Sequence, residues 1–386
     1  LTLTKLGKPK EAIERYTQAL ALYEQLPHAT ENHANCLYNL ANTLRIGDPN
    51  KAIERYTQAL GLYQQLPHPT EHHASCLYNL AITFFDLGDH QEAIKHYTQA
   101  LGLYQQLPHA TEDHADCQYN LANTFLNLDK LEEAIKRYTQ ALGLYQQLPH
   151  TTEQQADCLY NLALALDRIG ESEKAIERYT QALGLYQQLP HTTKGHANCL
   201  TGLATTLKEL GRHKEAIDRF TQALNLYQQL PHPTEHHANC QYNLANTLKE
   251  LGEHKEAIDH YHLALGLYQQ LPHPTENHAN CLNNLALTLT KLGDRKGAIK
   301  RYTQALGLYQ QLPHATQGHA NCLNNLANTF FDLGDHQEAI ERYTQALGLY
   351  QQLPHATQGH ANCLNNLALT LTKLGKPKEA IERYTQ

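Results

Sequence analysis

Residues 234–272 read TEHHANCQYNLANTLKELGEHKEAIDHYHLALGLYQQLP, and this stretch predicts two helices joined by a turn. The i, i+4, i+7 spacing of an amphipathic helix is followed by Cys240, Leu244, Ala245, Leu248 and Leu251. Thr234 precedes this run as an N-cap, and Gly252 follows it where glycine often ends a helix. Apolar residues then keep the same period as far as Leu271, and Pro272 is expected to end the second helix.

The stretch is one of nine near-identical copies. Their Leu-Pro-His landmark places prolines at Pro27, Pro67, Pro108, Pro149, Pro190, Pro231, Pro272, Pro313 and Pro354, with a first interval of 40 residues and seven intervals of 41. A helix pair repeated at such a period indicates an array in which each unit packs on its neighbours. An array offers a long surface instead of one pocket, which favours binding over catalysis.

The predicted array is a single solenoid over residues 1–386. We expect a partial unit at 1–29, full units at about 30–69, 70–110, 111–151, 152–192, 193–233, 234–274, 275–315 and 316–356, and a truncated unit at 357–386. Residues 1–18 are identical to residues 369–386, so the chain enters and leaves in mid-unit. Neither end carries the polar-faced cap usual in solenoids, and we therefore expect an excerpt from a longer array.

The shared pattern N-L-A-N-T-L-x-x-L-G-x-x-x-E-A-I-x-x-Y-x-x-A-L resembles the tetratricopeptide repeat. Its signature positions include Leu244, Ala245, Gly252, Ala257, Tyr261 and Ala264. The usual unit has about 34 residues, and the longer form here is similar to kinesin light chain, to LGN/Pins-type polarity adaptors and to bacterial arrays. The resemblance implies an all-α, right-handed superhelical solenoid of antiparallel helix pairs, in which the first helix of each pair lines a concave face.

The copies depart from the family pattern in a few places. The frequent family tryptophan is replaced by residues such as Leu37, Leu159 or Gln241, and its small glycine by Ala41 or Ala245. One turn is a residue shorter at 45–47, and Asp129 stands where other copies have the turn glycine. We expect local adjustments at these places and no change of fold.

Composition narrows the class of partner. The net charge is −7 and the isoelectric point is near 6.4, so no basic stripe is present and nucleic acid is an unexpected partner. No apolar run reaches the roughly 18 residues that a membrane span requires.

The nine cysteines occupy one phase of the repeat, and stacked repeats lie about 10 Å apart, beyond the reach of a disulfide. We therefore expect free thiols and a cytoplasmic protein.

An asparagine recurs on the polar side of the first helix. It is Asn39, Asn79, Asn120, Asn161, Asn243, Asn284, Asn325 and Asn366, and Gly202 is the one exception. In relatives of the resembled family, such as O-GlcNAc transferase, asparagines here hydrogen-bond the backbone of an extended peptide. An amide offers a donor and an acceptor to a peptide unit. The alternative is that these amides only satisfy neighbouring helix ends or water.

Differences between copies point to the same face. Recent duplication explains sameness, so positions that vary are more informative than positions that recur. The second helix and loop are nearly constant, whereas the first helix varies beside the asparagine and three residues after it. We predict specificity residues at Tyr38, Tyr78, Tyr119, Tyr160, Tyr242, Asn42, Asn123, Asn246 and Asn328; the equivalent residues elsewhere include Thr201, Asn283, Asn324, Asn365, Ile82, Leu164, Thr205, Leu287 and Leu369.

The histidines, cysteines and second-helix glycines have simpler explanations than a ligand site. His33 and Cys36 share a helix face as in many zinc sites, but Gln155 replaces the histidine in another copy, so we predict a core thiol with no metal and no cofactor. The 26 histidines are expected to make the surface sensitive to pH near neutrality. Glycines inside the second helix, such as Gly61 and Gly143, are expected to allow close helix approach.

No catalytic motif is present, and we predict that the chain is not an enzyme. The carboxylate clamp of chaperone-binding relatives needs lysines beside the asparagines, and only Lys208, Lys249, Lys291 and Lys373 occur near them. The favoured function is a scaffold that binds an extended peptide or protein segment in the concave groove. The alternatives are a structural protein that assembles end to end into filaments, and a sensor or adaptor arm of a larger signalling or effector protein.

Overall fold

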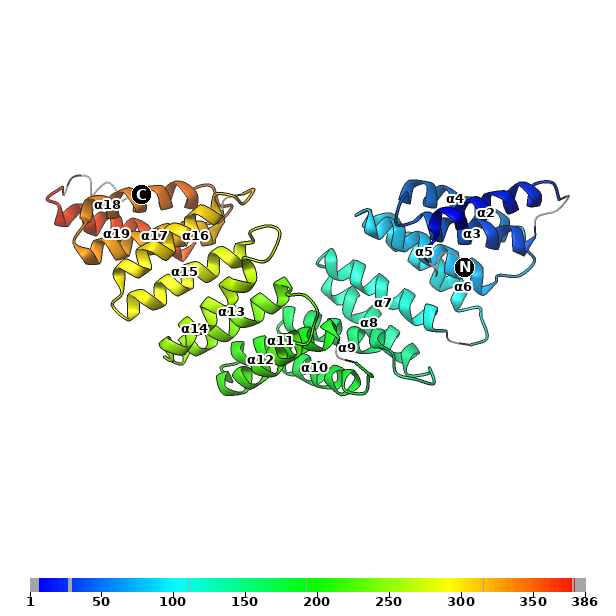
Figure 1. Ribbon diagram of the computed structural model, residues 1–386, viewed down its shortest axis with the longest axis horizontal. Coiled ribbons are helices and arrows are strands. Elements are labelled where there is room, and N and C mark those ends of the chain that lie inside the picture. The colour runs from blue at the N-terminus through cyan, green and yellow to red at the C-terminus, as the bar shows by residue number, and fades with distance from the viewer. Residues whose placement is uncertain are drawn as a thin grey trace. The chain divides into compact units, whose positions relative to one another are not determined.

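Eighteen helices and no strand are present in the described residues of the computed structural model, which are 7–26, 30–109, 111–191, 193–314, 316–376 and 378 (Figure 1). The chain divides into two compact units, Leu1–His191 and Thr192–Gln386. Each unit is a stack of helix pairs, and each pair consists of a first helix, a short turn and a second helix. The prediction of an all-α solenoid of antiparallel helix pairs is confirmed.

The first helices are α3 (Glu31–Leu44), α5 (Glu71–Asp86), α7 (Glu112–Asn127), α9 (Glu153–Arg168), α11 (Lys194–Glu209), α13 (Glu235–Glu250), α15 (Glu276–Lys291), α17 (Gln317–Leu333) and α19 (Gln358–Lys373). The second helices are α2 (Pro9–Tyr23), α4 (Pro49–Tyr63), α6 (His90–Tyr104), α8 (Leu131–Tyr145), α10 (Ser172–Tyr186), α12 (His213–Tyr227), α14 (His254–Tyr268), α16 (Arg295–Tyr309) and α18 (His336–Tyr350). Successive first helices contact one another within each unit.

Threonine N-caps start the first helices, as predicted. The side chain of Thr234 accepts a hydrogen bond from the backbone N–H of His237 at 3.2 Å, and each of the other first helices has the same cap. Gly252 follows α13 with a φ of 87°, a left-handed conformation that costs glycine nothing. Asp129 adopts a φ of 58° at the same place after α7, so the fold absorbs the missing glycine locally.

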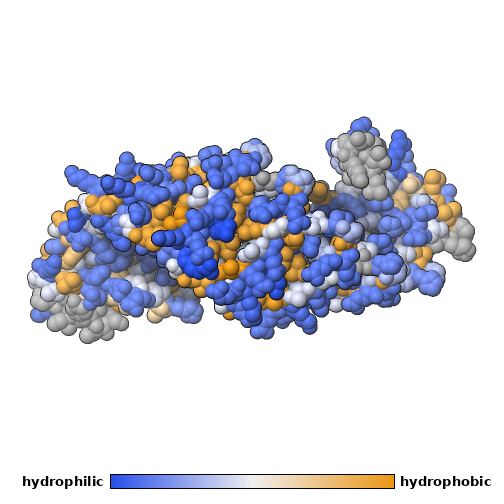
Figure 2. All heavy atoms as spheres, turned by 90° about the horizontal axis from the view of Figure 1, so that it is seen from below, coloured by the Kyte–Doolittle hydropathy of each residue, from blue (hydrophilic) through white to orange (hydrophobic). Residues whose placement is uncertain are grey.

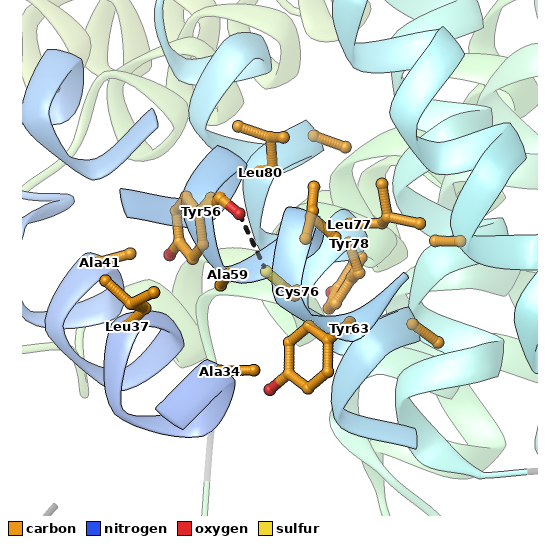
Figure 3. Packing of buried hydrophobic residues seen from close by; sticks show 14 of the residues in the cluster. Ala34, Leu37, Ala41, Tyr56, Ala59, Tyr63, Cys76, Leu77, Tyr78 and Leu80 are labelled. Atoms are coloured by element: carbon orange, nitrogen blue, oxygen red, sulfur yellow. Dashed lines mark hydrogen bonds between the residues drawn. The ribbon is translucent and has the colours of Figure 1, made fainter. Parts of the chain in front are cut away.

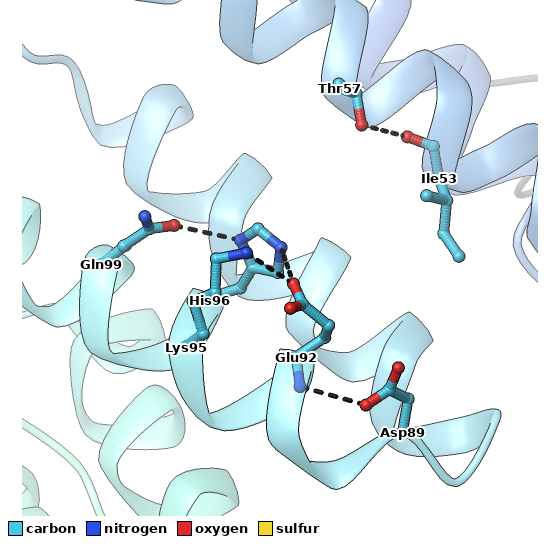
Figure 4. Close-up of polar contacts among 7 residues, drawn as sticks. All are labelled: Ile53, Thr57, Asp89, Glu92, Lys95, His96 and Gln99. Atoms are coloured by element: carbon cyan, nitrogen blue, oxygen red, sulfur yellow. Dashed lines mark hydrogen bonds and ion pairs between the residues drawn. The ribbon is translucent and has the colours of Figure 1, made fainter.

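The second helices end earlier than predicted. α14 ends at Tyr268 and not at Pro272, because the chain tightens into a turn in which the N–H of Leu271 bonds to the carbonyl of Tyr268 at 3.1 Å. At the other end, Asp89 caps α6 by accepting a bond from the N–H of Glu92 at 3.2 Å (Figure 4). Glu92 also pairs with Lys95 at 2.8 Å on the exposed side of this helix.

Tyrosine, alanine, leucine and cysteine build the core. Figure 3 shows Tyr56 and Tyr63 of α4 packed against Cys76 and Leu77 of α5, the first helix of the next repeat. Alanines such as Ala59 are fully buried, which lets neighbouring helices approach closely. The predicted stripe of α13 is buried except for Leu251, which is 42% exposed because it follows the last turn of the helix.

The face shown in Figure 2 is largely polar, with apolar side chains gathered in patches between the polar ones. None of the helices in the described part of the chain combines the length and the apolar character that crossing a bilayer requires. The expected close approach at the second-helix glycines is wrong. A methyl group added at Gly61, Gly143 or Gly307 would meet no atom within 4 Å.

Candidate binding surface on the first helices

The predicted asparagine ladder joins six of the first helices to the first helix of the preceding repeat. An amide hydrogen of Asn120 donates to the Tyr78 hydroxyl oxygen of the preceding repeat at 2.8 Å. The same bond forms from Asn79 to Tyr38, from Asn161 to Tyr119 and from Asn284 to Tyr242, at 2.8 to 3.0 Å. The ladder amides and the predicted specificity tyrosines are therefore hydrogen-bond partners.

The ladder changes where asparagine replaces the tyrosine. Asn325 donates to the side-chain oxygen of Asn283, which stands in place of the tyrosine, at 3.2 Å. Asn366 donates to Asn328 at 3.1 Å, a bond to the asparagine three residues after the preceding ladder position that also forms at the tyrosine junctions of Asn161 and Asn284. Within the described residues, Asn39 and Asn243 make no side-chain hydrogen bond to the preceding repeat, and Gly202 has no side-chain amide. We call a junction tyrosine-type where the residue before the ladder asparagine of the preceding repeat is a tyrosine, and asparagine-type where that residue is an asparagine.

The predicted specificity asparagines hold the second helix of their own repeat. The Tyr261 hydroxyl donates to the side-chain oxygen of Asn246 at 2.7 Å, and the equivalent tyrosines bond to Asn42, Asn123 and Asn328 at 2.5 to 2.6 Å. Leu287 stands at this position in one repeat, and the buried hydroxyl of Tyr302 there has no hydrogen-bond partner. These asparagines therefore have a structural role in addition to any role in recognition.

The ladder residues keep hydrogen-bonding capacity for a ligand. All eight asparagines are half-buried, so each is partly accessible to solvent. An asparagine side chain has two N–H donors and an acceptor oxygen. Asn120 donates one bond to the preceding repeat, whereas Asn161 and Asn284 each donate two, so the capacity that these two keep for a ligand is that of the side-chain oxygen. These bonds also fix the orientation of the amide, which lowers the entropy cost of a further interaction.

A second row of polar contacts escaped the sequence prediction. In seven repeats the last tyrosine of the second helix donates to the residue before the cysteine in the first helix of the same repeat, as Tyr268 does to Asn239 at 2.5 Å. Two repeats carry aspartate there, and Tyr145 donates to Asp116 at 2.5 Å. Burial raises the pKa of Asp116 to about 6 and also raises the pKa of Asp157. The two partners lie about 29 residues apart on different helices, and no pattern in the sequence indicated that they would meet.

The nine cysteines are buried and form no disulfide in the described part of the chain. The Cys76 thiol donates to the backbone carbonyl of Tyr56 in the preceding repeat at 3.7 Å (Figure 3). Burial raises the pKa of the Cys240 thiol to about 12, so this thiol stays protonated near neutrality. No group of three or more His, Cys, Asp or Glu side chains suited to a metal ion occurs in the described part of the chain.

Basic side chains lie at the C-terminal ends of several first helices, where the helix dipole favours them. Lys208 pairs with Glu250 of the next first helix at 3.1 Å. Burial lowers the pKa of Lys249, and the nearby Lys291 and Lys208 lower it further. Arg45 lies 4.0 Å from Asp86 at the corresponding ends of α3 and α5. These ends of the first helices carry charges that differ from repeat to repeat.

One pocket opens on the first-helix face. It has a volume of about 330 Å³ and is lined by Asn328, Phe331, Asp332, Tyr343, Asn366 and Leu369. Asn366 and Asn328 were predicted as site residues, whereas Phe331 and Asp332 were not. Both follow the asparagine positions on the same helix, and their variation among copies was the signal that could have found them.

Family models described as tetratricopeptide repeat match nearly the whole chain. One matches residues 1–65, 113–188, 237–311 and 318–386, and two others match 74–107 and 201–272. The chain belongs to the tetratricopeptide repeat family. No curated protein sequence matches this tetratricopeptide repeat chain.

Solved structures share the tetratricopeptide repeat fold at low sequence identity. The apo form of RapI is 14% identical with a TM-score of 0.64, over 91% of this chain and 95% of that one. The apo form of the quorum sensor NprR from B. thuringiensis is 14% identical with a TM-score of 0.61, over 90% and 99%. A STAND protein with a tetratricopeptide repeat sensor from Pyrococcus horikoshii is 13% identical with a TM-score of 0.63, over 88% and 53%.

Proposed function

We propose that this tetratricopeptide repeat chain is a non-enzymatic scaffold that binds an extended peptide or protein segment along its first helices. The observation that carries the proposal is the ladder of half-buried asparagines, six of which are held by a side chain of the preceding repeat and keep acceptor capacity for a ligand. An extended segment presents its backbone N–H and C=O groups at regular intervals, so a regular row of amides suits it.

The variable neighbours of the ladder would select side chains. In the tyrosine-type junctions a hydroxyl and an aromatic ring border the ladder, whereas in the asparagine-type junctions a smaller amide does. The partner is therefore expected to be a protein or peptide and not nucleic acid or membrane. The nine buried thiols, which form no disulfide within the described residues, support a reducing compartment such as the cytoplasm.

The test removes the amides and leaves the helices intact. Peptides selected from a random library on the wild-type chain serve as probes, and Asn120, Asn161 and Asn243 are changed to alanine together. Affinity for the selected peptides should fall by about tenfold or more, a loss of about 1.4 kcal/mol, with unchanged helicity by circular dichroism. Changing Gln58, Gln140 and Gln222 to alanine on the exposed side of the second helices is the matched control. Undiminished binding by the asparagine variant would refute the proposal.

End-to-end assembly into filaments and a place in a larger signalling protein remain hypotheses from the sequence. Sedimentation velocity over a range of concentrations tests the first, since filaments give a sedimentation coefficient that rises with concentration.

A further inference from the structure

The pocket between α17 and α19 combines three acceptors for a cation. Asp332 supplies an exposed carboxylate, and Phe331 supplies an aromatic face. Asn366 supplies a side-chain oxygen that takes no hydrogen bond within the described residues, since its amide nitrogen is the atom that donates to Asn328. Asn328 receives a second bond from the Tyr343 hydroxyl at 2.6 Å, which fixes the wall of the pocket.

Cations of this chain contact the Phe331 ring and the counterpart of the Asp332 carboxylate in another repeat. The Lys373 ammonium lies 4.2 Å from the centre of the Phe331 ring, within the range of a cation–π interaction. The segments 81–94 and 327–340 differ only at Ile82 and Asn328, so Asp86 is the counterpart of Asp332. Asp86 is paired with the Arg45 guanidinium of the preceding repeat at 4.0 Å. Within the described residues Asp332 has no such ion pair, because the residues that precede it in the array are Thr290 and Lys291 in place of Arg45 and Ile46.

We propose that the pocket between α17 and α19 receives a lysine or arginine side chain of the segment that binds along the first helices. This inference rests on the proposed function and adds the chemistry of one partner residue. The long aliphatic stem of such a side chain would pack on Leu369 and Phe331, and its charged end would meet Asp332 and the oxygen of Asn366. Lys373 competes with the incoming cation for the ring.

The experiment uses the full chain labelled with 4-fluorophenylalanine at its six phenylalanines. The Phe331 fluorine resonance is assigned with a Phe331→Leu variant. The probes are acetyl-Gly-Lys-Gly amide, acetyl-Gly-Arg-Gly amide and acetyl-Gly-norleucine-Gly amide, the last being a neutral control for the lysine stem. The lysine and arginine peptides should shift the Phe331 resonance in a saturable way, and the norleucine peptide should not. Equal shifts from the lysine and norleucine peptides would overturn the proposal.

Three variants sharpen the result. Asp332→Asn should weaken binding of the lysine peptide about threefold to fivefold, as expected for a partly exposed ion pair. Asp86→Asn, in the nearly identical segment of α5, should leave that binding unchanged. Lys373→Gln should strengthen it, because the competing ammonium is gone. An Asp332→Asn variant that is folded by circular dichroism and binds the lysine peptide like the wild type would contradict the proposal.

The two proposals fail separately. If ladder substitutions abolish binding of library-selected peptides but charge makes no difference at Phe331, the pocket assignment is wrong and the scaffold stands. If the lysine peptide still shifts Phe331 when Asn120, Asn161 and Asn243 are alanine and selected peptides bind that variant normally, the pocket stands and the ladder assignment is wrong.

Discussion

Asp116 lies at a position where most repeats have asparagine. The residue there accepts the hydroxyl hydrogen of the last tyrosine of the second helix, and Asn239 and Asp116 accept it equally well at 2.5 Å. Unlike the asparagine amide, the Asp116 carboxylate can carry a negative charge, which burial disfavours. The negative charges of the nearby Glu112 and Asp113 disfavour it further. Burial therefore raises the pKa of Asp116 from an ordinary value near 3.8 to about 6.

Asp116→Asn is predicted to stabilise the chain above neutral pH. A folded-state pKa above the unfolded value means that the contribution of Asp116 to stability is present below about pH 4 and is lost as pH rises through about 6. Asparagine keeps the acceptor and removes the ionisation. The expected gain at about pH 7.5 is about 1–2 kcal/mol, after discounting the full shift for solvent screening. Urea unfolding followed by circular dichroism at several pH values measures it.

The reverse substitution is the control. Asn239→Asp should lower stability at about pH 7.5, and both variants should match the wild type near pH 4, where the carboxylates are protonated. A gain from Asp116→Asn that is the same at pH 4 as at pH 7.5 would show that charge is not the cause.

Single residues on the first helix could be predicted only in part. The period of the repeat located the ladder asparagines, since an amphipathic helix has an evident polar side. Their partners could not be predicted, because Tyr78 and Asn120 meet only when two repeats stack at a specific distance and rotation. For the same reason nothing in the sequence indicated that Asn246 would accept the hydroxyl of Tyr261, or that Leu287 would leave Tyr302 without a partner.

The helices show which local rules decide element boundaries. The threonine caps and glycine turns were predicted because both are local in sequence: a threonine side chain accepts from a backbone N–H three residues later, and a turn glycine acts through its own φ. The end of the second helix was not, because Pro272 is compatible with several ways of leaving a helix, and the chain tightens into a turn after Tyr268. Leu251 was assigned to the core by its period, but the helix had already ended before it.

The second-helix glycines lower helix stability without an evident packing reason. Gly143 lies in α8, is exposed, and would place a methyl group in open space. Ala21 already occupies the equivalent place in α2, and the Gln25 amide still bonds to its carbonyl at 3.0 Å. Gly143→Ala is therefore predicted to stabilise the chain by roughly 0.5–1 kcal/mol, because alanine loses less backbone entropy on folding. The midpoint of urea unfolding measures the change.

Gly252→Ala is the contrasting variant for the helix prediction. The φ of 87° at Gly252 is a conformation that a residue with a Cβ adopts at a cost of about 1 kcal/mol or more. The same chemical change should therefore lower stability at residue 252 and raise it at residue 143. A shift of the same sign at both positions would contradict the explanation.

At the scale of the whole molecule, the repeat period predicted the stacking of helix pairs but not the division into two units. The Leu-Pro-His interval from Pro190 to Pro231 is 41 residues, the same as on either side, so the spacing carries no signal of a boundary at Thr192. Within each unit, neighbouring repeats are held together by contacts between their side chains. One kind of contact, between a histidine ring and a tyrosine ring, includes a group that titrates near neutral pH.

Histidine rings stack on the last tyrosine of the preceding repeat at seven junctions within the two units. Ring centroids are 5.2 to 5.5 Å apart and the planes are within 11° of parallel. Burial lowers the pKa of five of these histidines from an ordinary 6.5; they are His73, His114, His237, His278 and His319. The unfolded chain therefore takes up protons more readily than the folded chain as pH falls below about 7.

Acidification is accordingly predicted to loosen the repeats from one another. A histidine whose pKa is lower in the folded than in the unfolded chain contributes stability above pH 6.5, and this contribution is lost as the pH falls. Changing the five histidines to glutamine, the residue that Gln155 supplies at the equivalent position of another repeat, should flatten the decline in unfolding midpoint between about pH 7 and about pH 5. Gln155→His should steepen the decline, because it adds a half-buried histidine whose charged form is disfavoured by burial. Equal slopes for the wild type and the five-histidine variant would place the acid sensitivity elsewhere in the chain.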